Sequence, residues 1–189
     1  MIKAIIFDFG GVVQEGKYDA SFARTIAEKH GKSFDEVYPA CEKYLNILDS
    51  GVPIRFLEKF SKDLGIELEH EEFLGLLEKA VVINLPLIKV IKELKKTYNI
   101  LMLSDNDEFL VPILEEKFKE IMGLFEHKSF SYKVGACKPD PKMYKDLLRK
   151  AGLEAKDCVF IDDLQRNIDG AKRLGMKGIV YNNLYQVKE

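Results

Sequence analysis

The chain has 189 residues, of which 47% are hydrophobic, so it can bury a substantial core as one compact domain with at most a modest insertion, and general disorder is excluded. Its formal net charge is −2, with lysines and acidic residues interspersed rather than clustered. This pattern offers no cationic surface for nucleic acid or for an anionic membrane, so we expect a small-molecule partner.

The first predicted strand is the continuous apolar run Ala4 to Phe7, which is typical of a strand buried on both faces of a parallel sheet. The run ends at a single carboxylate, Asp8, and the chain continues with Gly10 and Gly11. A single charged residue directly after a buried strand, followed closely by two glycines, marks this turn as a candidate functional site.

From about Glu15 to Ile83 the sequence has no convincing strand but four helical patterns. They are separated by three glycine-containing breaks, at Gly31, at Gly51 to Pro53 and at Gly65. We therefore predict a helical insertion over residues 15–83, with residues 1–14 and 84–189 forming the core. The apolar residues of the insertion recur at helical spacing, and we interpret them as the interior of a small helical bundle.

Four polar or amphipathic residues of the insertion could face a pocket, namely Tyr18, Arg24, Tyr44 and Arg55. Surface or bundle-edge positions are nevertheless expected for each of them.

Three further apolar runs predict strands at Ile100 to Leu103, Val159 to Ile161 and Gly178 to Tyr181. Helices are predicted between these strands. One opens at Pro86, one has Asp140 and Pro141 at its start, and one ends at Leu174 and Gly175. Helices that alternate with buried strands indicate βαβ crossovers, and hence a doubly wound α/β core built on a parallel sheet.

Polar residues follow three of the predicted strands: Asp8, Ser104 to Asn106, and the pair Asp162 and Asp163. Lys138 lies in the loop "CKPDP" before a helix. Taken singly, each has a structural explanation as a helix cap, a first-turn acid or a solvated loop residue. In an open parallel sheet, however, ligands bind beyond the carboxyl ends of the strands, where all of these residues would meet.

Three carboxylates at one sheet edge would repel one another unless a cation lay among them. Magnesium takes one or two protein carboxylates together with phosphate oxygens, and an ammonium group and a hydroxyl at the same edge suit a phosphate. The set therefore predicts a site for phosphate and magnesium.

Four segments, "IIFDFGGVV", "ILMLSDN", "GACKPDPKMY" and "VFIDDLQRNIDGAKRLGM", occur in this order along nearly the whole chain. In order and spacing they resemble the four motifs of the haloacid dehalogenase superfamily of hydrolases and phosphatases. The predicted insertion is similar to the small helical cap of that family, in the branch of epoxide hydrolase phosphatase-like and sugar-phosphate phosphatase-like proteins. The resemblance implies a Rossmann-like core with a mobile cap.

The resemblance also implies roles for individual residues. Asp8 would be the nucleophile that forms an aspartyl phosphate, and Lys138 would place a positive charge on it and on the phosphate. Ser104, the amide after it, and Gly11 would hold phosphoryl oxygens. Asp8, the carbonyl of Gly10, Asp163 and Asp162 would bind Mg²⁺, with Asp163 as a direct ligand and Asp162 either direct or through water.

Two positions depart from the family pattern. Most phosphatases of the superfamily have a second aspartate two residues after the nucleophile, which protonates the leaving alcohol, and this chain has Gly10. Glycine keeps a carbonyl for the metal, so we expect attenuated rather than abolished catalysis. Asp105 stands where an amide is common and is interpreted as a replacement acid, a hydroxyl-binding group or a helix cap, with the cap preferred.

The leading hypothesis is a magnesium-dependent phosphatase acting on a small phosphorylated metabolite, such as a sugar phosphate. A dehalogenase is the first alternative, although the paired acids Asp162 and Asp163 would disfavour an anionic haloacid. The second alternative is a phosphate-binding regulatory protein without turnover, and only Gly10 supports it.

The cysteines and the lengths of the apolar runs indicate in which cellular compartment to expect the protein. Cys41, Cys137 and Cys158 form neither a CxxC pair nor a disulfide framework, which is typical of reduced thiols. The first apolar run is too short for a signal peptide, and no run approaches the length of a membrane span. We therefore expect a cytoplasmic protein.

Overall fold

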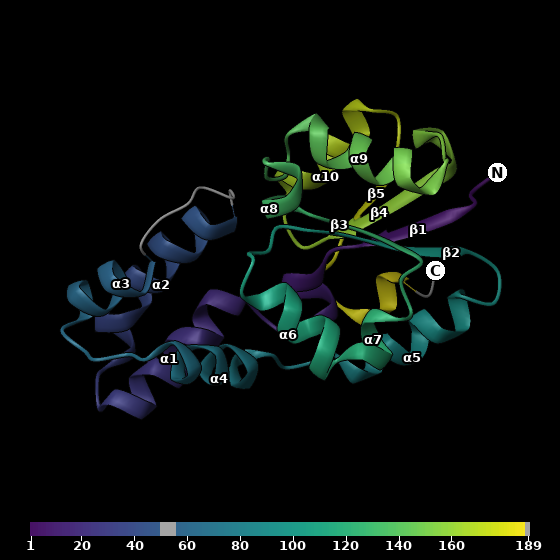
Figure 1. The fold of residues 1–189 in the computed structure, drawn as a ribbon. Helices are drawn as coiled ribbons and strands as arrows, with labels where there is room; N and C mark the ends of the chain where they lie inside the picture. Colours follow the sequence, from purple (N-terminus) through teal and green to yellow (C-terminus); the bar gives the residue numbers. More distant parts are fainter. Residues whose placement is uncertain (50–55, 188–189) are drawn as a thin grey trace.

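The computed structural model describes residues 1–49 and 56–187, and its centre is a parallel five-stranded sheet of order β3-β2-β1-β4-β5 (Figure 1). The strands are β1 (Ala4–Phe7), β2 (Asn99–Ser104), β3 (His127–Phe130), β4 (Cys158–Asp162) and β5 (Lys177–Val180). The predicted α/β fold with a doubly wound parallel sheet is confirmed. Four of the five strands were predicted from their continuous apolar runs, which reflect burial on both faces.

Helices cover both faces of the sheet, as Figure 1 shows. One face carries α9 (Pro141–Ala151) and α10 (Gln165–Arg173), and the other carries α5 (Leu85–Leu94), α6 (Leu110–Lys117) and α7 (Lys119–Met122). Side chains alternate across β1, so that Ile6 packs with the α9 and α10 layer and Ile5 with the α5 and α6 layer. Shorter segments complete the core: η1 (Phe9–Val13), α8 (Ser131–Val134), η2 (Ala155–Asp157) and η3 (Leu184–Val187).

The strand that sequence reasoning missed is β3, with sequence His-Lys-Ser-Phe. It lies at one edge of the sheet and pairs only with β2 among the described strands. His127 is exposed and Ser129 is buried, so the segment lacks the apolar run by which the inner strands were found. An edge strand can be polar because one of its sides has no neighbour to pack against.

Four helices form the insertion between β1 and α5: α1 (Tyr18–His30), α2 (Phe34–Asp49), α3 (Phe56–Leu64) and α4 (His70–Ala80). They share a hydrophobic core in which the ring of Phe22 lies 5.7 Å from that of Phe73 and 6.0 Å from that of Phe60. Their helical character was predicted. The predicted break at Gly51 to Pro53, and Arg55, lie outside the described residues.

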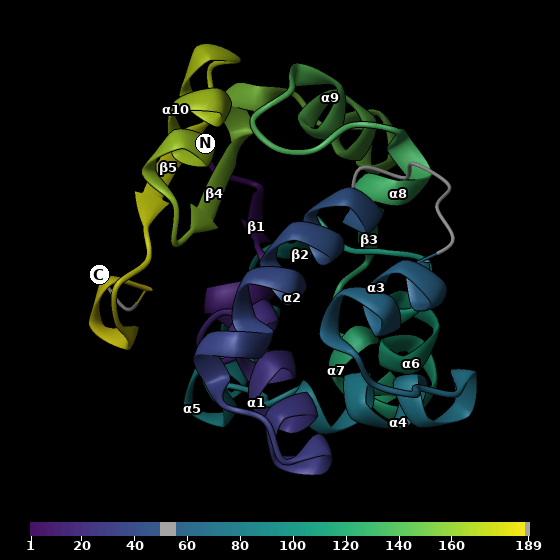
Figure 2. The same ribbon diagram turned by 90° about the vertical axis from the view of Figure 1, so that its left-hand side faces the viewer.

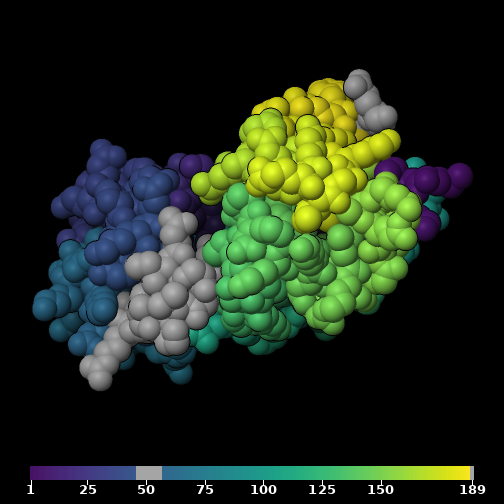
Figure 3. Space-filling model, turned by 90° about the horizontal axis from the view of Figure 1, so that it is seen from above, coloured from purple at the N-terminus to yellow at the C-terminus, as the bar shows by residue number. Residues whose placement is uncertain are grey.

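The two chain segments that connect the insertion to the core run antiparallel to each other. The amide of Glu15 donates to the carbonyl of Val82 at 2.8 Å, and the amide of Asn84 donates to that of Val13 at 2.9 Å. This short ladder places the inserted helices beyond the carboxyl ends of β1 and β2. In Figure 2 these helices stand in front of the sheet, and in Figure 3 they form a lobe beside the green and yellow core.

The helix boundaries follow the predicted signals. Asp140 accepts a hydrogen bond from the amide of Lys142 at 2.8 Å, so it caps α9, and Pro141 is the first residue of that helix. Gly175 follows α10 with a φ of +92°, which only glycine adopts without strain. No helix among the described residues is long and apolar enough to cross a membrane.

Gly170 allows α10 to pack tightly against the Lys138 loop and α9. A Cβ added at Gly170 would lie 2.8 Å from Cβ of Pro139 and 2.8 Å from the hydroxyl of Tyr144. We predict that Gly170→Ala lowers the free energy of unfolding by about 1–3 kcal/mol through overpacking. The matched control is Gly75→Ala on the exposed side of α4, where a Cβ meets nothing within 4 Å and a gain of about 0.5–1 kcal/mol is expected. Urea unfolding measures both, and equal stability of the two variants would contradict this packing.

Candidate active site

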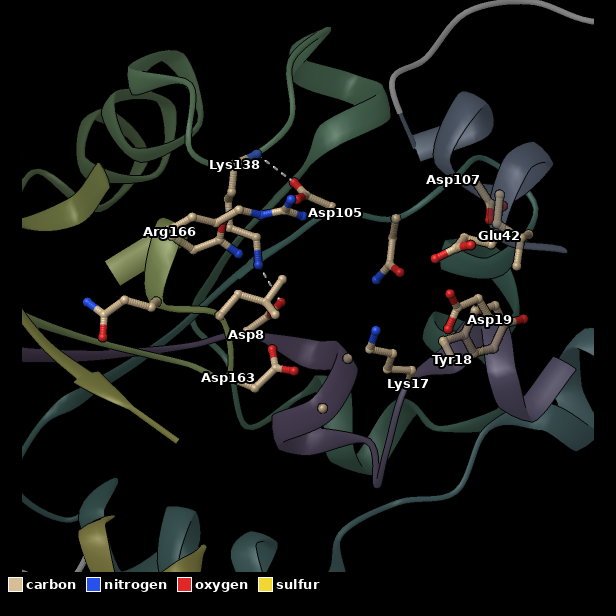
Figure 4. A pocket seen from close by; sticks show the side chains of 17 residues that line it. Asp8, Lys17, Tyr18, Asp19, Glu42, Asp105, Asp107, Lys138, Asp163 and Arg166 are labelled. Atoms are coloured by element: carbon tan, nitrogen blue, oxygen red, sulfur yellow. Dashed lines mark hydrogen bonds and ion pairs between the residues drawn. The ribbon is translucent and has the colours of Figure 1, made fainter. Parts of the chain in front are cut away.

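A pocket of about 790 Å³ opens where the carboxyl ends of the strands face the inserted helices (Figure 4). Its walls come from the turn after β1, the loop after β2, the Lys138 loop, the start of α10, and helices α1 and α2. The residues that line it are Asp8, Gly10, Gly11, Lys17, Tyr18, Asp19, Glu42, Leu45, Asp105, Asn106, Asp107, Lys138, Asp163, Leu164, Gln165, Arg166 and Asn167.

Asp8 is fixed at the end of β1 by its own backbone. Its amide donates to the carbonyl of Ile161 on β4 at 2.9 Å, which continues the sheet by one residue. Its side-chain oxygen Oδ1 accepts a hydrogen bond from the amide of Phe9 at 2.7 Å. The second oxygen, Oδ2, accepts no hydrogen bond from the described residues, so it is available for chemistry at the pocket.

Lys138 joins two strand ends through its side chain. Its ammonium lies 2.7 Å from Oδ1 of Asp8 and 2.9 Å from Oδ2 of Asp162, and all three side chains are buried. Burial alone would lower the pKa of Lys138, but the charges of Asp8 and Asp162 outweigh this effect and raise it. The lysine is therefore a permanent cation at the floor of the pocket.

Asp162 is held by several donors and does not lie at the pocket surface. Its oxygens accept hydrogen bonds from the amide of Leu164 at 2.8 Å and from the side-chain amide of Asn167 at 3.0 Å, in addition to the Lys138 contact. It is fully buried and is not among the described residues that line the pocket. Asp162 therefore orients Lys138 and the start of α10 from behind the site.

Asp163 lines the pocket next to Asp8, on the side away from Lys138 (Figure 4). The absence of a side chain at Gly11 leaves space for its carboxylate. Gly11 has a φ of +71°, and a Cβ there would lie 2.5 Å from Oδ2 of Asp163. Glycine is thus required at this position both by the left-handed backbone and by the approach of the carboxylate. The fold therefore explains why residue 11, the second glycine after Asp8, is a glycine.

The predicted metal ligands come together in the fold. Asp8, Asp162 and Asp163 each offer a carboxylate oxygen, and these oxygens lie within 4.8 Å of one another. Burial raises the pKa of both Asp8 and Asp163, and the Lys138 ammonium opposes that rise without cancelling it, so three carboxylates share one lysine at this edge of the pocket. Hard oxygen donors that outnumber their cationic partners fit a divalent cation such as Mg²⁺.

Gly10 differs from Gly11 both in its backbone conformation and in the space around it. Its backbone is ordinary, with φ −65° and ψ 134°, and a Cβ built on it meets nothing within 4 Å. The residue lines the pocket, so the position has room for a side chain directed towards the site. Neither strain nor packing requires glycine at residue 10.

The interpretation of Asp105 as a helix cap is wrong. Oδ1 of Asp107 accepts hydrogen bonds from the amides of Phe109 and Leu110, at 2.7 and 2.8 Å, and so caps the first turn of α6. Oδ1 of Asp105 instead accepts the backbone N–H of Lys138 at 3.0 Å. Asp105 therefore ties the loop after β2 to the loop that carries the lysine, and it lines the pocket.

Ser104 lies one layer below the pocket. It is buried, and its hydroxyl accepts a hydrogen bond from the side-chain amide of Asn106 at 3.1 Å. Ser104 itself is not among the described residues that line the pocket, whereas Asn106 is. The sequence predicted that this segment belongs to the site, but it did not indicate which of its side chains reach the cavity.

The wall contributed by the inserted helices was largely missed. Tyr18, for which a surface position was expected, lines the pocket together with Lys17, Asp19 and Glu42. Of the other residues considered, Tyr44 lies inside the helical bundle and donates to Asp63 at 2.6 Å, and Arg24 lies over the ring of Phe34. Which face of α1 and α2 meets the core depends on tertiary packing, and no local motif signals it.

Several known proteins are similar to this chain in sequence or in fold. A family model described as haloacid dehalogenase-like hydrolase matches residues 2–175. The chain is 27% identical over 195 residues to a D-ribitol-5-phosphate phosphatase of Bacteroides thetaiotaomicron, covering 94% of this chain and 90% of that protein. It is 28% identical over 171 residues to a bifunctional epoxide hydrolase of Sus scrofa, covering 88% of this chain and 29% of that protein. A haloacid dehalogenase family enzyme of Bacteroides thetaiotaomicron, in complex with magnesium and inorganic phosphate, superimposes with a TM-score of 0.75 at 19% identity, covering 95% of this chain and 93% of that one.

The contact between Gly11 and Asp163 gives a test with a matched control. Gly31 follows α1 with a similar φ of +64°, and a Cβ there meets nothing within 4 Å. We predict that Gly31→Ala costs about 1 kcal/mol of stability through left-handed strain alone. Gly11→Ala should cost about 2–4 kcal/mol, because the strain is joined by displacement of Asp163. Denaturant unfolding checks this, and equal losses would mean that Asp163 does not approach Gly11.

Proposed function

The chain belongs to the haloacid dehalogenase-like hydrolases, and on that premise we propose that it is a magnesium-dependent phosphomonoesterase acting on a small phosphorylated metabolite such as a sugar phosphate. One observation carries the proposal. The free oxygen of Asp8 opens into a polar pocket, with the buried cation of Lys138 on one side and the carboxylate of Asp163 on the other.

In the proposed reaction, Asp8 attacks the phosphorus atom of the ester. A bond from its carboxylate oxygen to phosphorus forms, and the bond from phosphorus to the alcohol oxygen breaks, leaving an aspartyl phosphate. The departing alkoxide takes a proton from solvent water. A water molecule then attacks the phosphorus and gives its proton back to solvent, the bond from phosphorus to the Asp8 oxygen breaks, and inorganic phosphate and the free carboxylate result. Lys138 stabilises the charge on both the nucleophile and the transferring group, and it remains protonated throughout.

The metal-holding residues are proposed from the donor set already described. Asp8 and Asp163 face the pocket and would bind Mg²⁺ directly, with the carbonyl of Gly10 as a third protein oxygen. Asp162, buried behind them, would act through water. The ion would supply positive charge that offsets the repulsion between the carboxylates and a phosphate dianion.

Phosphate binding is assigned to groups on three loops. Lys138, the backbone amide of Asp105 and the backbone at Gly11 would contact phosphoryl oxygens. Ser104, buried below the pocket, would act indirectly, because its hydroxyl accepts a hydrogen bond from the side-chain amide of Asn106, which lines the pocket. Asp105, bound to the amide of Lys138, would hold the lysine loop in register with that segment.

We assign residues 15–83 as a separate helical unit and residues 1–14 and 84–189 as the catalytic core. The inserted helices have their own hydrophobic core and join the rest through two adjacent strands of backbone. Residues from α1 and α2 line the side of the pocket opposite the carboxyl ends of the strands. This unit would exclude water and contact the leaving group.

The relatives support the phosphatase over the two alternatives. One is named a D-ribitol-5-phosphate phosphatase, and one solved structure holds magnesium and inorganic phosphate. For dehalogenation, an anionic haloacid would be repelled by the carboxylates that line the pocket, among them Asp8, Asp105 and Asp163. A regulatory protein without turnover has only the missing side chain at Gly10 in its favour.

A panel of phosphomonoesters tests the proposed function. With Mg²⁺ we expect release of inorganic phosphate that stops on chelation and returns when the metal is restored. Asp8→Asn should lower turnover at least about a thousandfold with an intact fold, because the nucleophile is lost. The control is Asp35→Asn, which removes an exposed carboxylate on α2 and should leave turnover unchanged. Metal-independent halide release, or phosphate binding without any product, would reject the phosphatase.

Gly10 gives a second test, because a phosphatase without a general acid depends on how easily its leaving group departs. Aryl and anomeric sugar phosphates should be hydrolysed about a hundredfold faster than simple alkyl phosphates. The open space at Gly10 accommodates Gly10→Asp, which should accelerate the alkyl esters most and flatten that dependence. Turnover of a leaving-group series by both proteins at saturating Mg²⁺ measures the effect. Parallel slopes would show that another group already supplies the proton.

A further inference from the structure

The proposed reaction develops negative charge at two places, and Lys138 serves only one of them. In a phosphoryl transfer the attacking and leaving oxygens lie roughly in line, on opposite sides of phosphorus. Lys138 contacts Oδ1 of Asp8, the attacking carboxylate, and Asp162 behind it, so it lies on the attacking side. The leaving alcohol oxygen would lie beyond phosphorus, farther from the strand ends and closer to the inserted helices.

Two other cationic side chains line the pocket, Lys17 and Arg166. Arg166 is the second residue of α10 and lies near Asp105 and Lys138 in Figure 4, and its charge opposes the burial-driven rise in the pKa of Asp105. Arg166 therefore belongs to the wall formed by the core. Lys17 directly precedes α1, and in Figure 4 its side chain points into the pocket between Asp163 and that helix. Of the two, Lys17 is the one on the leaving side.

The backbone holds Lys17 beside the turn that follows Asp8. The amide of Gly11 donates to the carbonyl of Gly16 at 2.9 Å, so the residue before Lys17 is bonded directly to that turn. The carbonyl of Lys17 accepts the amide of Ser21 at 3.1 Å in the first turn of α1. These main-chain hydrogen bonds fix the position of Lys17 relative to Asp8 independently of how the inserted helices pack on one another.

The ammonium of Lys17 has no competing partner within residues 1–49 and 56–187, where it forms neither a hydrogen bond nor an ion pair. Its charge nevertheless reaches the site, because it is among those that oppose the burial-driven rise in the pKa of Asp163. The side chain is exposed, so packing of the core does not account for it. Lys17 is therefore available to a ligand that occupies the pocket.

We propose that Lys17 contacts the leaving oxygen of the phosphomonoester and stabilises the negative charge that develops there. This inference rests on the proposed phosphatase function. When the bond from phosphorus to the alcohol oxygen breaks, its electron pair passes to that oxygen, and the ammonium offsets the charge while keeping its own proton. The alkoxide takes its proton from solvent water. Lys17 thus supplies part of the electrostatic help that an acid at residue 10 would give, but not the proton.

Loss of the Lys17 charge should matter most for esters whose leaving group is strongly basic. Lys17→Met keeps an unbranched side chain and removes the ammonium. It should lower kcat/KM about a hundredfold for the alkyl esters glycerol 1-phosphate and glucose 6-phosphate, which is the usual effect of removing one donor to a developing oxyanion. For p-nitrophenyl phosphate, whose leaving group departs without help, the loss should be about threefold or less.

The experiment measures kcat/KM of the three esters at saturating Mg²⁺ and neutral pH, with p-nitrophenyl phosphate as the internal reference for correctly folded protein. Lys17→Arg keeps the positive charge and should restore most of the alkyl-ester activity that Lys17→Met loses. Arg166→Met removes the other cation and should change all three esters by the same factor. The matched control Lys59→Met removes an exposed lysine of α3 outside the pocket and should leave every value unchanged.

The outcomes separate this inference from the function on which it rests. A ratio of aryl to alkyl kcat/KM that rises at least about tenfold in Lys17→Met, and falls back in Lys17→Arg, supports the inference. Equal losses for all three esters, no loss, or a rise of the ratio in Arg166→Met instead would overturn it and leave the phosphatase standing. If the unaltered protein releases phosphate from none of the esters, the proposed function is overturned and the inference with it.

Discussion

The contact of one buried ammonium group with two buried carboxylates is the interaction on which this site depends. Lys138 lies between Asp8 and Asp162, each of which ends a strand of the sheet. Removing one member of such a buried group leaves an uncompensated charge, which typically costs about 3–5 kcal/mol. The loop that carries Lys138 is therefore bound to β1 and β4 by electrostatics as well as by packing, and the geometry of the pocket floor follows from that attachment.

Sheet register explains why these charges meet at all. In the parallel pairing of β1 with β4, Phe7 lies opposite Ile161, so the residues that follow, Asp8 and Asp162, lie side by side at the carboxyl ends of these strands. β2 pairs with the other side of β1 and brings the Ser104 segment to the same edge. Neighbouring carboxylates at this edge are a direct product of the topology, and the cation that relieves them comes from a loop rather than from a strand.

The sequence predicted those features that depend on local patterns, namely the inner strands and the polar residues that follow them. β1, β2 and β4 are continuous apolar runs because both of their faces are covered, and a polar residue directly after such a run identifies the strand end. β3 was not predicted as a strand, because an edge strand does not need a continuous apolar run. Asp105 and Asp107 are both acids shortly after β2, and the sequence could not tell that Asp107 caps α6 while Asp105 binds the lysine loop. That difference depends on where the chain turns, not on the residue type.

Of the two adjacent glycines that follow Phe9, only the second is required by the fold. Gly11 is favoured by the structure, since a side chain there would strain the left-handed backbone and displace the nearby carboxylate of Asp163. Gly10 is not imposed, because its backbone is ordinary and its Cβ position opens onto free space in the pocket. In the proposed phosphatase, a pocket that has room for a general acid at residue 10 but lacks one would leave departure of the alcohol to the chemistry of the substrate itself and to the charge of Lys17.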